Sequence, residues 1–186
     1  MDQPLTIETI LNWLRSNVLP PQIVKCDHVT CDRQELPLFL GEKLAGTGRG
    51  SRIAQVDLIV CDQSSQTVNL IIEVDPNPNP KKVLGDILAV LLADNYTPSN
   101  EFQPFKIKDA VFVYVTVLPE NPHSQKAKQF RQIEAALQAK LDLRSLGIHA
   151  VHLCHASTEE GAVERFRQTV EPYLSSGQLK VKASVQ

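Results

Sequence analysis

Two short apolar runs that carry acidic residues constrain the fold of this chain more than any other feature. They lie in QVDLIVCDQSSQTVNLIIEVDPNPNPKK, residues 55–82, and each run is long enough for a buried strand. The polar segment DQSSQT separates them and has the length of a hairpin turn. Because burying an unpaired carboxylate is costly, Asp57, Glu73 and Asp75 need a compensating partner within this pair of strands.

The spacing of the acidic residues predicts that two of them face each other. Side chains alternate between the two faces of a strand, so a residue shares its face with the second residue before and after it. An antiparallel pair in the register that places Cys61 opposite Asn69 also places Asp57 opposite Glu73, with their Cβ atoms about 5 Å apart. Like charges at this distance destabilise a strand pair. This register therefore predicts a cation between the two carboxylates.

A divalent cation is the compensation we expect for these carboxylates. Mg²⁺ prefers oxygen ligands, typically one or two carboxylates together with waters and substrate phosphate. Asp57 and Glu73, with the main chain of Val74, are the expected ligands. The alternative is that the acidic residues lie near strand ends and form ordinary ion pairs with nearby arginine or lysine side chains.

Length, charge and cysteine content limit the domain number, the binding partners and the location that we expect for this protein. The chain has 186 residues, 42% of them hydrophobic, which suits one compact domain spanning 1–186. Its formal charge of −2 excludes the overall basic excess of strong non-specific nucleic-acid binders. Four scattered cysteines and a first segment without a signal-peptide pattern predict a cytoplasmic protein, and no apolar run reaches the roughly 20 residues of a membrane span.

The pattern of elements predicts an α/β domain with a central mixed β-sheet flanked by helices. Helical spacing over 4–17 has Thr6 as an expected N-cap, and Asn79 followed by Pro80 predicts a second helix from about Lys81. The remaining predicted elements are strands near 22–31, 53–61, 68–75, 110–118 and 148–154 and helices near 124–141 and 162–174. The later alternation of helix and strand implies crossover connections and parallel pairing.

The segments VDLIV and LIIEVD resemble the PD-(D/E)xK, or restriction-endonuclease-like, nuclease superfamily, particularly its divergent branch related to very-short-patch repair endonucleases. The resemblance implies a restriction-endonuclease-like core over about 4–118, followed by a C-terminal α-β-α extension over about 123–175. It also implies a DNA endonuclease that depends on Mg²⁺, with Mn²⁺ as a substitute. By this resemblance Asp57 and Glu73 hold the metal ion.

The chain departs from the family pattern at one catalytic position. The lysine expected two residues after Glu73 is replaced by Asp75. Either Lys81 or Lys82 reaches back from the second helix as a displaced lysine, or Asp75 is a third metal ligand. We favour Lys82, since its position beside Val83 and its spacing to Asp86 place it at the rim of the buried helix face. The third possibility is an inactive nuclease-like module that binds a protein partner or nucleic acid.

A glycine-rich basic loop, LGEKLAGTGRGSR, precedes the first acidic strand. Arg49, Arg52 and Gln55 are therefore expected to bind DNA substrate, although a flexible surface loop is the simpler interpretation.

The resemblance adds two further expectations. A glutamate of the first helix often contributes to the metal site of this superfamily; Glu8 is the positional candidate, and Glu35 and Glu42 compete with it. Many members of the superfamily are homodimers, which makes a homodimer a further possibility here.

The group Cys26, His28 and Cys31 lacks the spacing of a zinc module.

Overall fold

The computed structural model describes residues 4–28, 31, 34–41, 51–98, 103–118 and 125–175, and of residues 4 and 5 only the main chain. Along the described chain the elements are α1 (Pro4–Asn17), β1 (Gln22–Cys26), β2 (Pro37–Phe39), β3 (Arg52–Gln55), β4 (Leu58–Asp62), β5 (Thr67–Asp75), α2 (Pro80–Leu91), β6 (Asn95–Tyr96), β7 (Phe105–Val117), α3 (Gln125–Lys140), the 3-10 helix η1 (Leu143–Leu146), β8 (Ile148–Ala156) and α4 (Glu159–Ser175).

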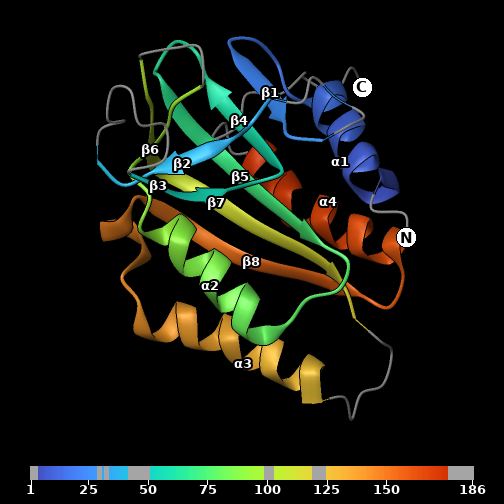
Figure 1. Ribbon diagram of the computed structural model, residues 1–186. Helices are drawn as coiled ribbons and strands as arrows, with labels where there is room; N and C mark the ends of the chain where they lie inside the picture. The colour runs from blue at the N-terminus through green and yellow to red at the C-terminus, as the bar shows by residue number, and fades with distance from the viewer. Residues whose placement is uncertain are drawn as a thin grey trace.

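All strands belong to one mixed sheet, shown in Figure 1. The strand order is β1-β4-β5-β7-β6-β2-β3, and β8 also pairs with β7. β5 and β8 run parallel to β7, whereas β1, β4 and β5 form antiparallel pairs with one another in turn. β6 borders the first residues of β7 and β8 borders the remainder, so β7 has neighbours on both sides. The predicted α/β class with a mixed sheet is confirmed.

Helices cover both faces of this sheet (Figure 1). α2 and α3 pack on one face, against alternate residues such as Ile59, Ile71 and Phe112. α1 and α4 pack on the other face, against the intervening residues such as Val60 and Ile72. This division follows from the period of two along each strand, because consecutive apolar residues can all be buried only when both faces are covered.

The predicted strand near 53–61 is wrong in one respect, because two separate strands occupy this segment. β3 pairs with β2, whereas β4 pairs with β1 and β5. The exchange occurs at Val56, whose N–H donates to the carbonyl of Leu36, and at Asp57, whose N–H donates to the carbonyl of Ile72. The antiparallel pairing of β4 with β5 is confirmed.

A β-bulge alters part of the predicted register. Leu58 lies opposite Ile72 and Ile59 opposite Ile71, but after Val60 the register shifts and Cys61 pairs with Val68. The predicted Cys61–Asn69 pair is therefore wrong. The acidic end of the pair precedes the bulge along β4 and keeps the expected register.

The start of α2 agrees with the sequence prediction, and the start of α1 does not. Asn79 caps α2 through its side chain, which accepts the N–H of Lys81, and Pro80 is the first helical residue. Thr6, expected to cap α1, lies inside that helix, and its hydroxyl donates to Glu159 on α4 at 2.9 Å. This contact ties the first helix to the last.

The C-terminal third of the chain belongs to the same core as the rest. β8 pairs with β7 along most of its length, and α4 shares an apolar cluster with α1. Residues 125–175 therefore extend the central sheet and cover it, instead of forming a separate packing unit. Among the described helices none is both long and apolar enough to cross a membrane.

Gly147 supports the entry into β8 and gives a test of the fold. Its φ is +74°, and a Cβ at this position would lie 2.6 Å from the carbonyl oxygen of Ile107. We expect Gly147→Ala to lower the free energy of unfolding by about 2 kcal/mol, because it adds both backbone strain and a main-chain clash. Urea denaturation followed by circular dichroism measures this loss.

Gly85 is the matched control for that substitution. It lies in α2, where an added Cβ would meet nothing within 4 Å. Gly85→Ala should therefore stabilise the protein by about 0.5–1 kcal/mol through helix propensity. Equal effects of the two substitutions would contradict the described geometry at Gly147.

Candidate metal and catalytic site

Ionisable side chains converge at one edge of the sheet, where four elements meet. β5 and β7 are parallel, so their carboxyl ends lie side by side, and β4 begins next to the end of β5. α2 starts after a short connection from β5 and covers the same face. The carboxyl ends of parallel strands and the first turn of a helix therefore border one small region, which is a common position for binding sites in α/β proteins.

Asp57 and Glu73 lie on the same face of this region. The register of β4 and β5, continued by one residue from the Leu58–Ile72 pair, places Asp57 opposite Glu73. Both follow the alternation of Ile59 and Ile71, which point to the α2 side. The Oδ2 atom of Asp57 accepts the N–H of Val74 at 2.7 Å, so the main chain of β5 fixes this carboxylate.

Partial burial raises the pKa of both carboxyl groups. Burial, opposed by the Val74 hydrogen bond, raises the pKa of Asp57 to about 6. Burial and the neighbouring charge of Asp57 raise the pKa of Glu73 to about 9, with a further contribution from Asp86. At neutral pH Glu73 therefore retains its proton in the folded protein, because a second negative charge beside Asp57 is not compensated.

Asp75 is held by a different set of partners. Its Oδ2 accepts the Nζ of Lys82 at 2.7 Å and the hydroxyl of Tyr114 at 3.1 Å, and its Oδ1 accepts the N–H of Asn77 at 2.9 Å. Its main-chain carbonyl accepts the hydroxyl of Thr116 on the neighbouring strand. Although Asp75 is buried, the hydrogen bonds from Lys82 and Asn77 lower the pKa of its carboxyl group.

Lys82 connects this buried aspartate to the other carboxylates. Partial burial opposes its charge, but the hydrogen bond that it donates to Asp75 and the charges of Asp75, Asp86 and Glu73 raise the pKa of its ammonium group. Its amino group remains partly open to solvent, because the side chain is 55% exposed. Lys82 thus carries a fixed positive charge at the rim of a cluster of acids.

Asp86 completes the cluster from the second turn of α2. It lies four residues after Lys82, and its Oδ2 atom is buried without a hydrogen-bond partner. Burial raises the pKa of its carboxyl group, and the charge of Lys82 acts in the opposite direction. A buried acceptor without a donor is uncommon in folded proteins and points to a missing ligand, water or ion.

The two lysines at the start of α2 point in different directions. Lys81 is exposed and lines a groove between α2 and α3, on the side away from the carboxylates. Lys82 contacts Asp75. This difference follows from the helical rotation of about 100° per residue.

The expected substrate-binding residues are dispersed. Arg49 lies outside the described residues, and Arg52 forms an ion pair with Glu35 at 3.3 Å. Gln55 is exposed, and its amide donates to the side chain of Asp27. Arg52 and Gln55 therefore both have protein partners, and Gln55 lies near the acidic pair, because the main-chain N–H of Asp27 donates to the carbonyl of Asp57.

The helix glutamate of the family pattern is not at this site. Glu8 is exposed on α1, and α1 covers the opposite face of the sheet from Glu73. Glu35 is engaged with Arg52, and Glu42 lies outside the described residues.

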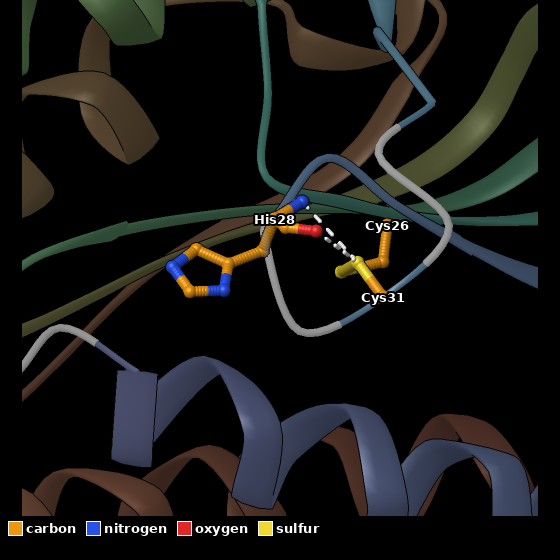
Figure 2. The surroundings of a disulfide bond; sticks show 3 residues. All are labelled: Cys26, His28 and Cys31. Atoms are coloured by element: carbon orange, nitrogen blue, oxygen red, sulfur yellow. Dashed lines mark hydrogen bonds between the residues drawn. A yellow bond between two sulfur atoms is a disulfide. The ribbon is translucent and has the colours of Figure 1, made fainter.

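A disulfide-closed turn flanks Asp57, and Figure 2 shows its surroundings. Cys26 at the end of β1 is bonded to Cys31, and the main-chain N–H of His28 donates to the Cys31 sulfur at 3.2 Å. Asp27 in this turn donates its N–H to the carbonyl of Asp57 at 2.8 Å. Disulfides are rare in cytosolic proteins, so the cytoplasmic location stays a prediction.

The donor set of the site fits a Mg²⁺ ion held by two carboxylates. Among the described residues, no three aspartate, glutamate, histidine or cysteine side chains are arranged to hold a metal ion. Asp75 faces Lys82 and Tyr114, which makes it a poor third ligand. Asp57 and Glu73 offer the carboxylate oxygens that Mg²⁺ prefers, and this ion commonly completes its coordination with waters and phosphate oxygens.

Tyr114 and Thr116 contribute to this site and were not predicted. They lie within the apolar run VFVYVTV and resemble ordinary buried strand residues, so the sequence offers no signal for their contacts with Asp75. The spacing of Asp86 supported the choice of Lys82, because residues four apart lie on the same helix face, but Asp86 itself was not predicted as a site residue.

Comparison with protein families, with curated proteins and with solved structures finds no match to this chain.

The raised pKa of Glu73 predicts a pH-dependent stability. The unfolded chain loses this proton near its ordinary value of 4.5, whereas the folded chain keeps it up to about pH 9. The folded state therefore binds more protons in this interval, so wild-type stability falls as pH rises through it. Glu73→Gln removes this term and should be more stable than wild type by up to about 4 kcal/mol at pH 7.5 and by less than about 1 kcal/mol at pH 5, since each pH unit above 4.5 contributes about 1.4 kcal/mol.

Urea denaturation at several pH values measures this difference. Glu171→Gln, an exposed position on α4, is the control, and its effect should stay within about 0.5 kcal/mol at each pH. A Glu73→Gln variant whose advantage does not grow between pH 5 and pH 7.5 would refute the assignment of a buried, protonated Glu73.

Proposed function

We propose that this chain is a Mg²⁺-dependent phosphodiesterase that cleaves DNA as an endonuclease of the PD-(D/E)xK type. One observation carries the proposal: Asp57 and Glu73 are paired across neighbouring strands in a half-buried setting, near the ammonium group of Lys82. Two half-buried acids that face each other lower the stability of the protein unless a cation joins them. Their position near a partly exposed lysine favours a role in binding a metal ion and a phosphate.

Asp57 and Glu73 are the residues that would hold Mg²⁺. When bound, this ion supplies Lewis-acid polarisation of a phosphate group and lowers the pKa of water. The Val74 N–H keeps Asp57 oriented and ionised, and Glu73 must release its proton when the ion binds. The unpaired Oδ2 atom of Asp86 is a further acceptor at the edge of this site for a water or a protonated group.

Lys82 has the role that the family pattern gives to the lysine after the second acid. Its ammonium group stabilises negative charge on a phosphate. Asp75 and Tyr114 act through Lys82: the carboxylate holds the ammonium group at 2.7 Å, and the tyrosine hydroxyl holds the same carboxylate oxygen. Asp75 therefore serves as a positioning residue, which gives a physical reason for an acid at the position where the family has a lysine.

DNA is the proposed substrate on the strength of the family resemblance. The segments VDLIV and LIIEVD correspond to the end of the β3–β4 region and to β5, and the helix that follows, α2, supplies the lysine. A restriction-endonuclease-like core, a cytoplasmic location and the use of Arg49, Arg52 and Gln55 in DNA binding belong to the same proposal.

A second candidate function has its own supporting observation. The Asp75–Lys82 ion pair already neutralises the lysine, and Arg52 is engaged with Glu35. An inactive nuclease-like module that binds a protein or nucleic acid would retain this arrangement without needing a metal ion. Metal binding separates the two candidates.

The first test measures metal binding without any substrate. Millimolar Mg²⁺ or Mn²⁺ should raise the melting temperature of the wild type, because an ion that binds only the folded state stabilises it. Asp57→Asn and Glu73→Gln should abolish this shift, and Lys82→Ala should leave it nearly unchanged. A wild-type protein that shows no shift and no cleavage supports the inactive module.

The second test measures cleavage of plasmid and linear DNA. Asp57→Asn and Glu73→Gln should abolish cleavage in Mg²⁺ or Mn²⁺, and Lys82→Ala should lower the rate about a hundredfold, as expected for loss of one electrostatic contact. Lys81→Ala is the matched control, since its side chain lies on the groove side of α2. Activity that persists in both acidic-residue variants assigns the cleavage to another site or to a contaminant.

A further inference from the structure

α2 carries a second apolar face that the core does not use. Val83, Ile87 and Val90 are buried against the sheet, whereas Leu84, Leu88 and Leu92 are 39%, 43% and 54% exposed. These three leucines follow one another at intervals of four residues, so they form a stripe along one side of the helix. A stripe of this kind is typical of a helix that packs against another helix.

The stripe borders a groove that is the right size for a partner's side chains. Between α2 and α3, which lie side by side in Figure 1, there is an open hollow of about 480 Å³. Its walls are formed by Leu84 and Leu88 of α2 and by Ile133 and Leu137 of α3. An apolar groove between two helices is a typical receptor for the apolar face of a third helix.

The charges at the two ends of α2 suit an antiparallel copy of the same helix. Lys81 lies in the first turn and Asp94 just beyond the last, so each charge is unfavourable for the dipole of its own helix. An antiparallel α2 brings Lys81 to the carboxyl end of its neighbour and Asp94 to the amino end, where both are favourable. Lys140 also lies on the groove rim, and the exposed Asp142 follows it two residues later.

We propose that the α2–α3 groove is a homodimer interface in which α2 packs antiparallel against α2 of a second copy. With Leu88 on the two-fold axis, Leu84 faces the partner's Leu92, and Lys81 lies within one residue of the partner's Asp94. One surface thus complements itself in both shape and charge, as a two-fold interface requires. Lys82 points to the sheet face of α2 and takes no part in this contact.

Sedimentation equilibrium of the full chain tests the proposal without reference to cleavage. The wild type should show a monomer–dimer equilibrium below about 100 µM, a concentration range accessible to this method. Leu88→Glu should weaken dimerisation by at least about tenfold, because it places two charges on the axis of an apolar contact. Asn12→Glu, at an exposed position of α1 on the opposite face of the sheet, is the control and should leave the dimer intact.

Charge reversal tests the antiparallel arrangement itself. Lys81→Glu and Asp94→Lys should each weaken the dimer several-fold, and the double variant should recover most of the loss, because it restores the ion pair with reversed signs. Thermal melting checks that Asp94→Lys still folds, since the Asp94 carboxylate accepts the N–H of Gly41 at 2.6 Å.

Three outcomes would overturn the proposal. A wild type that remains monomeric at about 100 µM shows that the groove does not bind a second copy of the chain. A dimer that survives Leu88→Glu unchanged uses another surface. A double charge variant that is weaker than both single variants excludes the antiparallel arrangement. None of these outcomes bears on the metal and cleavage tests, so the two proposals fail independently.

Discussion

The parallel pairing of β5 with β7 is the constraint on which the rest of the structure depends. Parallel neighbours cannot be joined by a tight turn, so the chain must leave the end of β5, cross one face of the sheet and return to the start of β7. α2 makes most of that crossing, and its first turn therefore lies beside the strand end that it has just left. The same pairing brings Tyr114 and Thr116 of β7 next to Asp75, so the topology places acid, lysine and tyrosine together.

Two opposite electrostatic situations coexist within this small region. Asp75 is buried but fully provided with donors, and the pKa of its carboxyl group is lowered. Glu73 is half-buried with acids around it, and the pKa of its carboxyl group is raised to about 9. The first arrangement is complete in the protein alone, whereas the second becomes favourable only with a cation. This contrast explains why Asp57 and Glu73, and not Asp75, are the proposed metal ligands.

The sequence predicts those parts of the fold that depend on local periodicity and capping. Alternation of apolar residues in β4 and β5 predicts their pairing, and Asn79 with Pro80 predicts the start of α2. Helical rotation of about 100° per residue also distinguishes the direction of Lys82 from that of Lys81. These features are governed by residues close together in the chain, whose geometry follows from the backbone alone.

Features that depend on distant partners could not be predicted in this way. The exchange of strand partners at Val56 involves the distant carbonyl of Leu36, and the bulge after Val60 coincides with a register shift of β5 against β7 between Val68 and Leu70. Tyr114 lies 39 positions after Asp75, and its own apolar segment gives no sign that its hydroxyl contacts an acid. The Cys26–Cys31 bond likewise depends on a turn whose sequence resembles an ordinary strand.

The location of β5 and β7 at the centre of the sheet has a consequence for the time scales of motion at the site. Both strands have neighbours on each side and helices on each face, so their amide hydrogens exchange with water only when the whole sheet opens. Glu73 and the Val74 amide that holds Asp57 belong to this slowest-exchanging layer. Lys82 instead reaches the site through a long side chain that is 55% exposed, so its ammonium group can move without any opening of the sheet. The acidic half of the site is thus fixed by the sheet, whereas its basic half can rearrange while the sheet stays closed.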